Sequence, residues 1–86
     1  MSLETRVLAT VFKNLEKDLE VTLESRLIED LEVDSLNKLM IIAGLEDEFE
    51  ITINEGDFRQ ISTVGEIVVQ LRKRYPELEG ESNAAE

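Results

Sequence analysis

The feature of this sequence that most constrains its fold is the spacing of its apolar residues. They recur at three- and four-residue steps in three segments, residues 3–17, 35–50 and 64–75. Side chains at these steps fall on the same face of a helix. The spacing therefore predicts three helices and an all-α fold.

Two shorter segments complete the expected fold. Residues 51–53 form an extended link that is too short to build a sheet. Residues 55–60 are expected to form one or two turns of a short helix, with Phe58 and Ile61 turned inward. A chain of 86 residues supports about one compact core. We therefore predict a small four-helix bundle of three longer helices and one short helix.

Local signals mark several helix ends. Ser2 precedes the first helix as a candidate N-cap. Thr63 and Glu66 have the three-residue spacing of a capping box at the start of the last helix. Pro76 ends that helix, and the basic residues 72–74 complement the negative end of its dipole.

A long connection separates the first two predicted helices. Residues 18–33 place short apolar contacts among acidic residues, and we expect them to fold over the bundle as a loop, with Ser25 starting a short turn. The predicted bundle domain covers residues 1–76. Residues 77–86 are small and acidic, have nothing to bury, and are expected to form a disordered tail.

The helix predicted for residues 35–50 has two apolar faces, because each residue advances the helix by about 100°. One face carries the residues expected in the core: Ile41, Ile42, Leu45 and Phe49. The opposite face carries Leu36, Leu39, Met40 and Ala43, with Asp47 and Glu50 beside them. The second face is either buried as well or exposed for docking, and a bundle this small favours docking.

Two residues within this helix can be interpreted in more than one way. Gly44 costs about 1 kcal/mol relative to alanine. A structural explanation is simple tolerance or close packing against a neighbouring helix, and a functional one is room for a ligand. Lys38 lies near the core side of the first turn, where a lysine commonly lays its stem along the surface and keeps its charge in water.

Composition excludes several kinds of active site. The chain has no cysteine and no histidine. Thiol nucleophiles, disulfides and catalytic triads with histidine are therefore excluded, and so are zinc sites built from these residues. The glycines are isolated, so no Gly-rich phosphate loop is present. We expect no enzyme activity and no metal site.

The formal net charge of −11 limits the choice of partners. Such a surface repels nucleic-acid phosphates and anionic lipids, so we expect no nucleic-acid binding and no membrane insertion, and we expect partners with basic surfaces. The first residues have no basic leader and no long apolar run, which favours a cytoplasmic location. A monomer is expected.

The tripeptide Asp34-Ser35-Leu36 opens the helix of residues 35–50. Aspartate and serine commonly cap helices, because their side-chain oxygens accept hydrogen bonds from the first unpaired N–H groups. Capping alone is one interpretation. The other is that the Ser35 hydroxyl is a point of covalent attachment, since no histidine in the chain can activate it as a nucleophile.

Four short segments, taken in order, resemble those of the acyl carrier proteins. They are residues 28–31 (Ile-Glu-Asp-Leu), 34–36 (Asp-Ser-Leu), 45–49 (Leu-Glu-Asp-Glu-Phe) and 61–64 (Ile-Ser-Thr-Val). The resemblance covers residues 3–75. No single segment is decisive, but four in order at the family's spacing are specific.

The resemblance implies that Ser35 is esterified by 4′-phosphopantetheine, which a separate phosphopantetheinyl transferase transfers from coenzyme A with magnesium. In this family the acid before the serine, here Asp34, contributes to that transfer. The arm ends in a thiol that carries acyl groups as thioesters, so it supplies the sulfur that the chain lacks. A helix N-terminus also favours an anion such as the phosphodiester.

The resemblance further implies where partners and cargo are held, in fatty acid, lipid or polyketide-type biosynthesis. Acyl-loading and acyl-processing enzymes are expected to contact the second apolar face and its acids: Leu36, Leu39, Met40, Ala43, Asp47 and Glu50. As in the fatty-acid carriers of the family, the core is expected to shelter the acyl chain. The candidate lining residues are Ala43, Gly44, Ile53, Phe58 and Ile61.

Four positions depart from the family's common pattern. Glu32 stands where glycine is usual, and Gly44 is unusual. Asn37 and Met40 stand where the carriers of fatty acid synthesis commonly have acids that face partners. Electrostatic docking should therefore be weaker and the docking site more hydrophobic, so we predict a specialised carrier and not the housekeeping one.

Two alternatives remain open. A peptidyl or aminoacyl carrier would share the bundle and the modified serine but carry a different cargo. An unmodified helical interaction module would dock through the second apolar face and use Asp34 and Ser35 only as helix caps.

Overall fold

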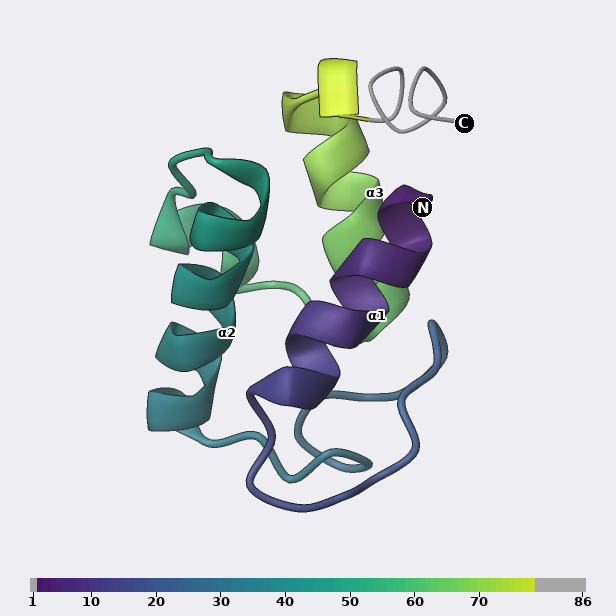
Figure 1. Cartoon of the computed structure of the whole chain (residues 1–86). Helices are drawn as coiled ribbons and strands as arrows, with labels where there is room; N and C mark the ends of the chain where they lie inside the picture. Colours follow the sequence, from purple (N-terminus) through teal and green to yellow (C-terminus); the bar gives the residue numbers. More distant parts are fainter. Residues whose placement is uncertain (1, 79–86) are drawn as a thin grey trace.

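A computed structural model of the chain describes residues 2–78 (Figure 1). This part contains three α-helices, α1 (Leu3–Lys13), α2 (Ser35–Phe49) and α3 (Val64–Arg74), and one 3-10 helix, η1 (Glu55–Phe58). Its only sheet-like feature is an isolated antiparallel bridge between Arg26 and Thr63. The all-helical class is confirmed, and the short helix predicted after the link is a single 3-10 turn.

Helix α1 packs against both α2 and α3, and the loop of residues 14–34 closes one end of the helices (Figure 1). Arg6 fastens α1 to the other end of α2. Its Nε donates to Glu48 Oε2 over 3.0 Å, and its guanidinium carbon lies 4.5 Å from the centre of the Phe49 ring. The start of α2 therefore lies beside the loop, and its end is held by α1.

The core is formed by one apolar face of each helix and by residues of the loop. The helices contribute Leu3, Val7, Val11, Ile41, Ile42, Leu45, Phe49, Val64, Ile67, Val68 and Leu71, and η1 contributes Phe58. The loop adds Leu27, Leu31 and Val33. Each such side chain stabilises the fold by about 1.5–3 kcal/mol through burial. The predicted core face of α2 and the predicted folding of the loop over the bundle are confirmed.

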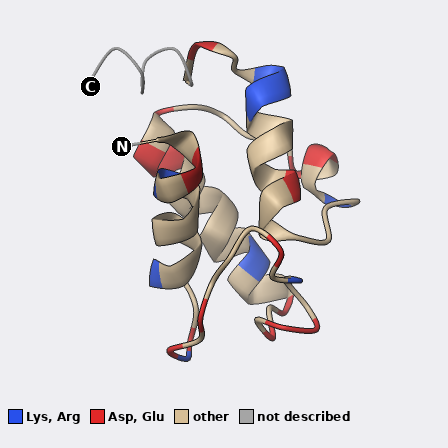
Figure 2. Cartoon of the chain, turned by 90° about the vertical axis from the view of Figure 1, so that its right-hand side faces the viewer, with Lys and Arg blue, Asp and Glu red and all other residues tan. Residues whose placement is uncertain are grey.

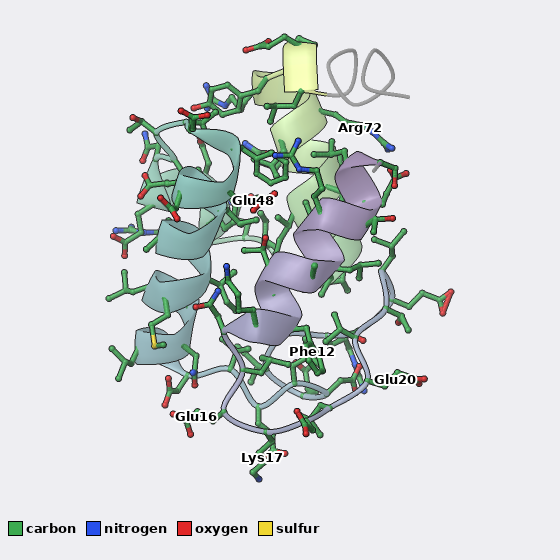
Figure 3. The ribbon with its side chains drawn as sticks, viewed as in Figure 1. Phe12, Glu16, Lys17, Glu20, Glu48 and Arg72 are labelled. Atoms are coloured by element: carbon green, nitrogen blue, oxygen red, sulfur yellow. The ribbon has the colours of Figure 1, made fainter. Side chains whose placement is uncertain are left out.

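Helix α1 is shorter than the predicted helix of residues 3–17. It ends at Lys13, with Asn14 as C-cap, and the Asn14 amide Nδ2 donates to the Thr10 carbonyl over 2.9 Å. Ser2 caps its start, as predicted. Phe12 is one of the apolar residues whose spacing predicts the first helix and its buried face, but it is 46% exposed at the loop end of α1 (Figure 3). Thr10 is buried instead, because its hydroxyl donates to the Arg6 carbonyl and needs no water.

Backbone hydrogen bonds fix the loop to the start of α3. Gly65 N–H donates to the Leu23 carbonyl over 2.8 Å, and Leu27 N–H donates to the Ser62 carbonyl over 2.8 Å. Ser25 was predicted to start a short turn. In the structure it is instead the last residue of a turn that begins at Thr22. These contacts join segments that are far apart in the sequence.

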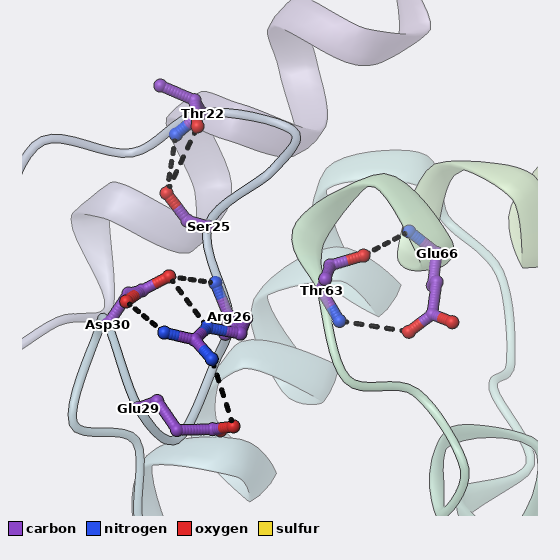
Figure 4. Close-up of polar contacts among 7 residues, drawn as sticks. All are labelled: Thr22, Ser25, Arg26, Glu29, Asp30, Thr63 and Glu66. Carbon is purple, nitrogen blue, oxygen red and sulfur yellow. Dashed lines mark hydrogen bonds and ion pairs between the residues drawn. The ribbon is translucent and has the colours of Figure 1, made fainter.

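An ion pair stiffens the middle of the loop (Figure 4). The backbone N–H of Arg26 donates to Asp30 Oδ2 over 2.8 Å, and the Arg26 guanidinium lies 3.3 Å from the same oxygen. The two hydrogen bonds and the neighbouring cation lower the pKa of Asp30. The turn before α2 is thus held by charge-assisted hydrogen bonds.

The capping box at the start of α3 is confirmed (Figure 4). Thr63 Oγ1 accepts from Glu66 N–H over 3.3 Å, and Glu66 Oε1 accepts from Thr63 N–H over 3.0 Å. At the other end, the basic residues do more than complement the helix dipole, because Arg72 pairs with Glu4 at 2.5 Å and Arg74 pairs with Asp57 at 2.8 Å.

The predicted tail begins with a residue that is part of the core. Leu78 is only 4% exposed, so the expectation that the chain has nothing to bury after residue 76 is wrong at this position. Its N–H donates to the Tyr75 carbonyl, which turns the chain back onto the bundle after Pro76. The rest of the predicted tail, residues 79–86, lies outside the described residues.

Candidate functional site

The start of α2 is capped by Asp34. Its backbone is extended, its Oδ1 accepts from Asn37 N–H over 2.8 Å, and its carbonyl accepts from Lys38 N–H over 2.9 Å. These two bonds make Asp34 the N-cap of α2. Ser35 is the first helical residue and is not needed as a cap.

The Ser35 side chain is exposed, and its hydroxyl takes part in no hydrogen bond within residues 2–78. The backbone N–H groups of Ser35 and Leu36 precede the first intrahelical hydrogen bond of α2. An accessible hydroxyl therefore lies where the helix carries about half a positive charge. These features fit a phosphodiester attached to Ser35.

A groove of about 320 Å³ lies beside this hydroxyl. It is formed by the loop, the first turn of α2 and the segment between η1 and α3, and its lining residues are Leu27, Ile28, Val33, Asp34, Ser35, Lys38 and Ile61. Its volume is at the lower end of the roughly 300–1,000 Å³ typical of small-molecule sites. The groove can thus accommodate a slender chain that starts at Ser35.

The second apolar face of α2 is exposed, as predicted. The exposed fractions are 62% for Leu36, 49% for Leu39 and 44% for Met40, and Ala43, Asp47 and Glu50 are exposed as well. The core residues of α2 lie on its other side. Three large apolar side chains on one exposed helix face form a patch of the kind that marks partner sites.

The residues predicted to line an acyl-chain cavity are separated in the structure. Ile61 lines the groove beside Ser35, whereas Ile53 and Phe58 line a space of about 10 Å³ next to the end of α3. That space is about large enough for one water molecule. Ala43 lies on the exposed face of α2. The described core contains no cavity shared by these residues.

Gly44 is explained by helix packing. A Cβ atom at this position would lie 2.7 Å from Asn14 Nδ2 and 3.1 Å from Thr10 Cγ2, both on the α1 side. The glycine therefore allows α1 and α2 to approach closely. Of the two interpretations of Gly44 from the sequence, the structure supports packing.

Asn37 was expected to face partners, and this expectation is wrong. The residue is 4% exposed, and its amide Nδ2 has no hydrogen-bond partner among the described residues. It lines a cavity of about 170 Å³ together with Leu15, Glu16, Lys17, Leu31 and Glu32. The spacing alone would have predicted that Asn37 is buried, because residue 37 lies four residues before Ile41 and eight before Leu45 on the core face of the helix.

Glu32 occupies a backbone conformation that explains why glycine is usual there. Its φ of 55° lies in the left-handed region, which is strained for residues with a Cβ atom. The carboxylate pairs with Lys17 at 3.1 Å across the loop. This ion pair is exposed and contributes little stability by itself.

Charge is distributed unevenly over the molecule (Figure 2). Acidic residues follow the loop, and basic residues gather at the end of α3. The segment from Ser35 to Leu45 contains no acid and one cation, Lys38. Within the described residues, no group of three or more potential metal-binding side chains is present, and no helix is long and apolar enough to cross a membrane.

Comparison with known proteins identifies the family. A family model described as "Phosphopantetheine attachment site" matches residues 5–71. An acyl carrier protein from Chlamydia caviae is 39% identical over 75 residues, which cover 86% of this chain and 97% of that protein. One from Thermotoga maritima is 40% identical over 55 residues, covering 64% and 68% of the two chains.

A solved structure shows the same relationship. A candidate acyl carrier protein from Mycobacterium tuberculosis superposes with a TM-score of 0.76 at 34% identity, and the match covers 86% of this chain and 100% of the other. The resemblance inferred from the sequence is therefore confirmed. The chain belongs to the acyl carrier proteins of the phosphopantetheine-attachment family, which carry acyl groups on a covalently attached 4′-phosphopantetheine.

Proposed function

We propose that the 4′-phosphopantetheine of this carrier is attached to Ser35. The observation that supports this assignment most strongly is that Asp34, and not Ser35, caps the start of α2. Asp34 provides the cap, so the exposed Ser35 hydroxyl is free of hydrogen bonds within the described residues. A residue that served only as a helix cap would have its hydroxyl bound to a backbone N–H group.

The residues around Ser35 stabilise and help to install the group. The helix N-terminus contributes about 0.3–1 kcal/mol to holding the phosphodiester anion. We assign to Asp34 a role in the magnesium-assisted transfer from coenzyme A, with Oδ1 retained by Asn37 N–H and Oδ2 outside that bond. Once attached, the arm supplies a terminal thiol on which acyl groups are held as thioesters.

The exposed face of α2 is the docking surface in this proposal. Leu36, Leu39 and Met40 contact the apolar part of a partner, and Asp47 and Glu50 attract its basic rim. These partners are the phosphopantetheinyl transferase and the enzymes that load and process the cargo. Catalysis belongs to those enzymes, and the carrier presents the thioester.

The cargo proposed is an acyl group of fatty acid, lipid or polyketide-type biosynthesis. The form Asp34-Ser35-Leu36 and the strong acidity favour acyl over aminoacyl cargo, and the relatives that match are named acyl carrier proteins. The absence of acids between Ser35 and Leu45 supports a specialised member of the family. We propose that it acts as a monomer in the cytoplasm, with the 3-10 turn as the fourth element of its helical bundle.

Loading with an acyl group tests this function. The protein is incubated with magnesium, an acyl-coenzyme A and a promiscuous phosphopantetheinyl transferase, and its intact mass is measured before and after hydroxylamine treatment. We expect one acyl-phosphopantetheine to be added, and hydroxylamine to release the acyl part alone, because it cleaves thioesters. Ser35→Ala should gain nothing, whereas the matched exposed serine variant Ser62→Ala should load like the parent. Equal loading of Ser35→Ala would refute the assignment.

A further inference from the structure

Lys38 stands out among the residues beside the attachment serine. It lies three residues after Ser35 on the same side of α2, and both residues line the groove of about 320 Å³. Side chains at this spacing are neighbours on a helix surface. Lys38 is half-buried, and its ammonium takes part in none of the ion pairs found within residues 2–78.

Lys13, Arg59 and Lys73 also take part in none of these ion pairs, but Lys38 is the cation that lines the groove beside Ser35. Lys17, for comparison, pairs with Glu32 at 3.1 Å. Asp34 lies one helical turn before Lys38 and also lines the groove, yet its Oδ1 is engaged in the helix cap. The groove therefore presents one cation, Lys38, and one carboxylate, Asp34, beside the hydroxyl that receives an anionic group, and only Lys38 attracts that group.

Four of the residues that line the groove are apolar, and two of these belong to the core. Leu27 and Val33 are part of the core, and Ile28 projects from the loop with an exposed fraction of 71%. Leu27 N–H is bonded to the Ser62 carbonyl, and Val33 N–H to the Leu27 carbonyl over 2.9 Å. Ile61 also lines the groove. An exposed apolar side chain such as Ile28 gains free energy when another apolar chain covers it.

We propose that Lys38 and this groove hold the phosphopantetheine arm when no partner enzyme is bound. The Lys38 ammonium pairs with the phosphodiester on Ser35, and the apolar walls cover the pantetheine chain. This inference rests on the proposed attachment to Ser35 and adds a resting position for the arm. Lys38 is a positioning residue, since it acts on the phosphodiester and not on the thioester.

The resting position has a consequence for carrier function. A partner enzyme must draw the arm out of the groove before the thiol end enters its active site. The pairing must therefore be weak, as expected for a partly exposed ion pair in water. It also offsets the repulsion between the new phosphodiester and the neighbouring Asp34 carboxylate.

Nuclear magnetic resonance of the modified protein tests this inference without any partner enzyme. Parent, Lys38→Ala, Lys38→Glu and Lys38→Arg are compared in unmodified and modified forms, with Lys13→Ala as a matched control for an exposed lysine away from the groove. Intact mass first establishes that each protein carries one arm. Backbone amide shifts then report contact at Leu27, Ile28 and Ile61, and the phosphorus resonance reports the environment of the phosphodiester.

In the parent, attachment of the arm should shift the amide resonances of Leu27, Ile28 and Ile61. These shifts should fall about two- to fivefold in Lys38→Ala, the range expected for loss of a weak ion pair. They should fall further in Lys38→Glu and persist in Lys38→Arg and Lys13→Ala. Salt at 1 M, where the screening length is about 3 Å, should act like Lys38→Ala.

The possible failures are distinguishable. Absence of groove shifts in the modified parent, or shifts in Lys38→Ala equal to those of the parent, would overturn the resting position and leave attachment to Ser35 intact. Failure of the parent to gain an arm would overturn the proposed attachment, and this inference with it.

Discussion

Gly65 is the place where a small substitution should disturb the loop that shapes the groove. Its N–H donates to the Leu23 carbonyl over 2.8 Å, and a Cβ atom would lie 2.9 Å from the same oxygen. The obstructing atom belongs to the backbone, so a change of rotamer cannot relieve the contact. Gly65→Ala should therefore push the loop away from the start of α3.

The expected loss of stability follows from three opposing terms. Overpacking costs about 1–3 kcal/mol, and weakening the hydrogen bond to Leu23 costs part of its roughly 0.5–1.5 kcal/mol. Alanine returns at most about 1 kcal/mol through its helix propensity. The net change is a loss of about 1–2 kcal/mol, and each kcal/mol lowers the melting temperature of a domain this size by about 4–8 °C.

Urea unfolding followed by far-ultraviolet circular dichroism measures this loss, as a lower midpoint at an unchanged slope. Gly56→Ala is the matched control, because this glycine is exposed and its Cβ would meet only the movable Asn54 side chain, at 3.2 Å. There the mild contact and the reduced conformational entropy of the unfolded chain nearly cancel, within about 1 kcal/mol. A Gly65→Ala variant as stable as the parent, or equal losses in both variants, would refute this reasoning.

Three further predictions concern acid stability, the buried amide and docking. Hydrogen bonds from the N–H groups of Ser62 and Thr63 lower the pKa of Glu66 in the folded protein. The ionised Glu66 therefore stabilises the fold at pH values above its unfolded pKa of about 4.3, and this stabilisation is lost as the pH falls through the lower pKa of the folded state. The stability difference between parent and Glu66→Gln, measured by urea unfolding, should therefore shrink on acidification, and a constant difference would contradict the shift. Asn37→Leu removes a buried amide without a partner among the described residues and should raise the free energy of unfolding by about 1 kcal/mol; a less stable variant would show that the amide is satisfied by water in the adjoining cavity. Leu39→Ala should raise the transferase KM about five- to tenfold, equivalent to roughly 1–1.4 kcal/mol, with an unchanged circular dichroism spectrum, and an unchanged KM would place docking elsewhere.

The helices and their core faces could be predicted because local spacing determines them. The capping box of Thr63 and Glu66 is likewise a local signal. The end of α1 was missed because Leu15 continues the apolar steps, whereas the Asn14 cap ends the helix first. The burial of Asn37 was missed because its polar side chain outweighed its position on the buried face of α2.

The site was only partly predictable. The place of Ser35 at the start of α2 follows from the local sequence, and the family resemblance gives it a role. The groove could not be predicted, because it exists only when the loop folds back and Leu27 bonds to the Ser62 carbonyl. The residues predicted to line an acyl-chain cavity do not lie together, because Gly44 packs against α1 and Phe58 is part of the core.

The attachment of the arm to Ser35 can be tested most directly by peptide mass spectrometry. Trypsin cleaves after Arg26 and Lys38 and releases residues 27–38, in which Ser35 is the only residue with a hydroxyl group. After incubation with coenzyme A, magnesium and a phosphopantetheinyl transferase, this peptide should gain the mass of one phosphopantetheine. An unchanged 27–38 peptide, with the added mass on a peptide that contains another serine, would contradict the assignment.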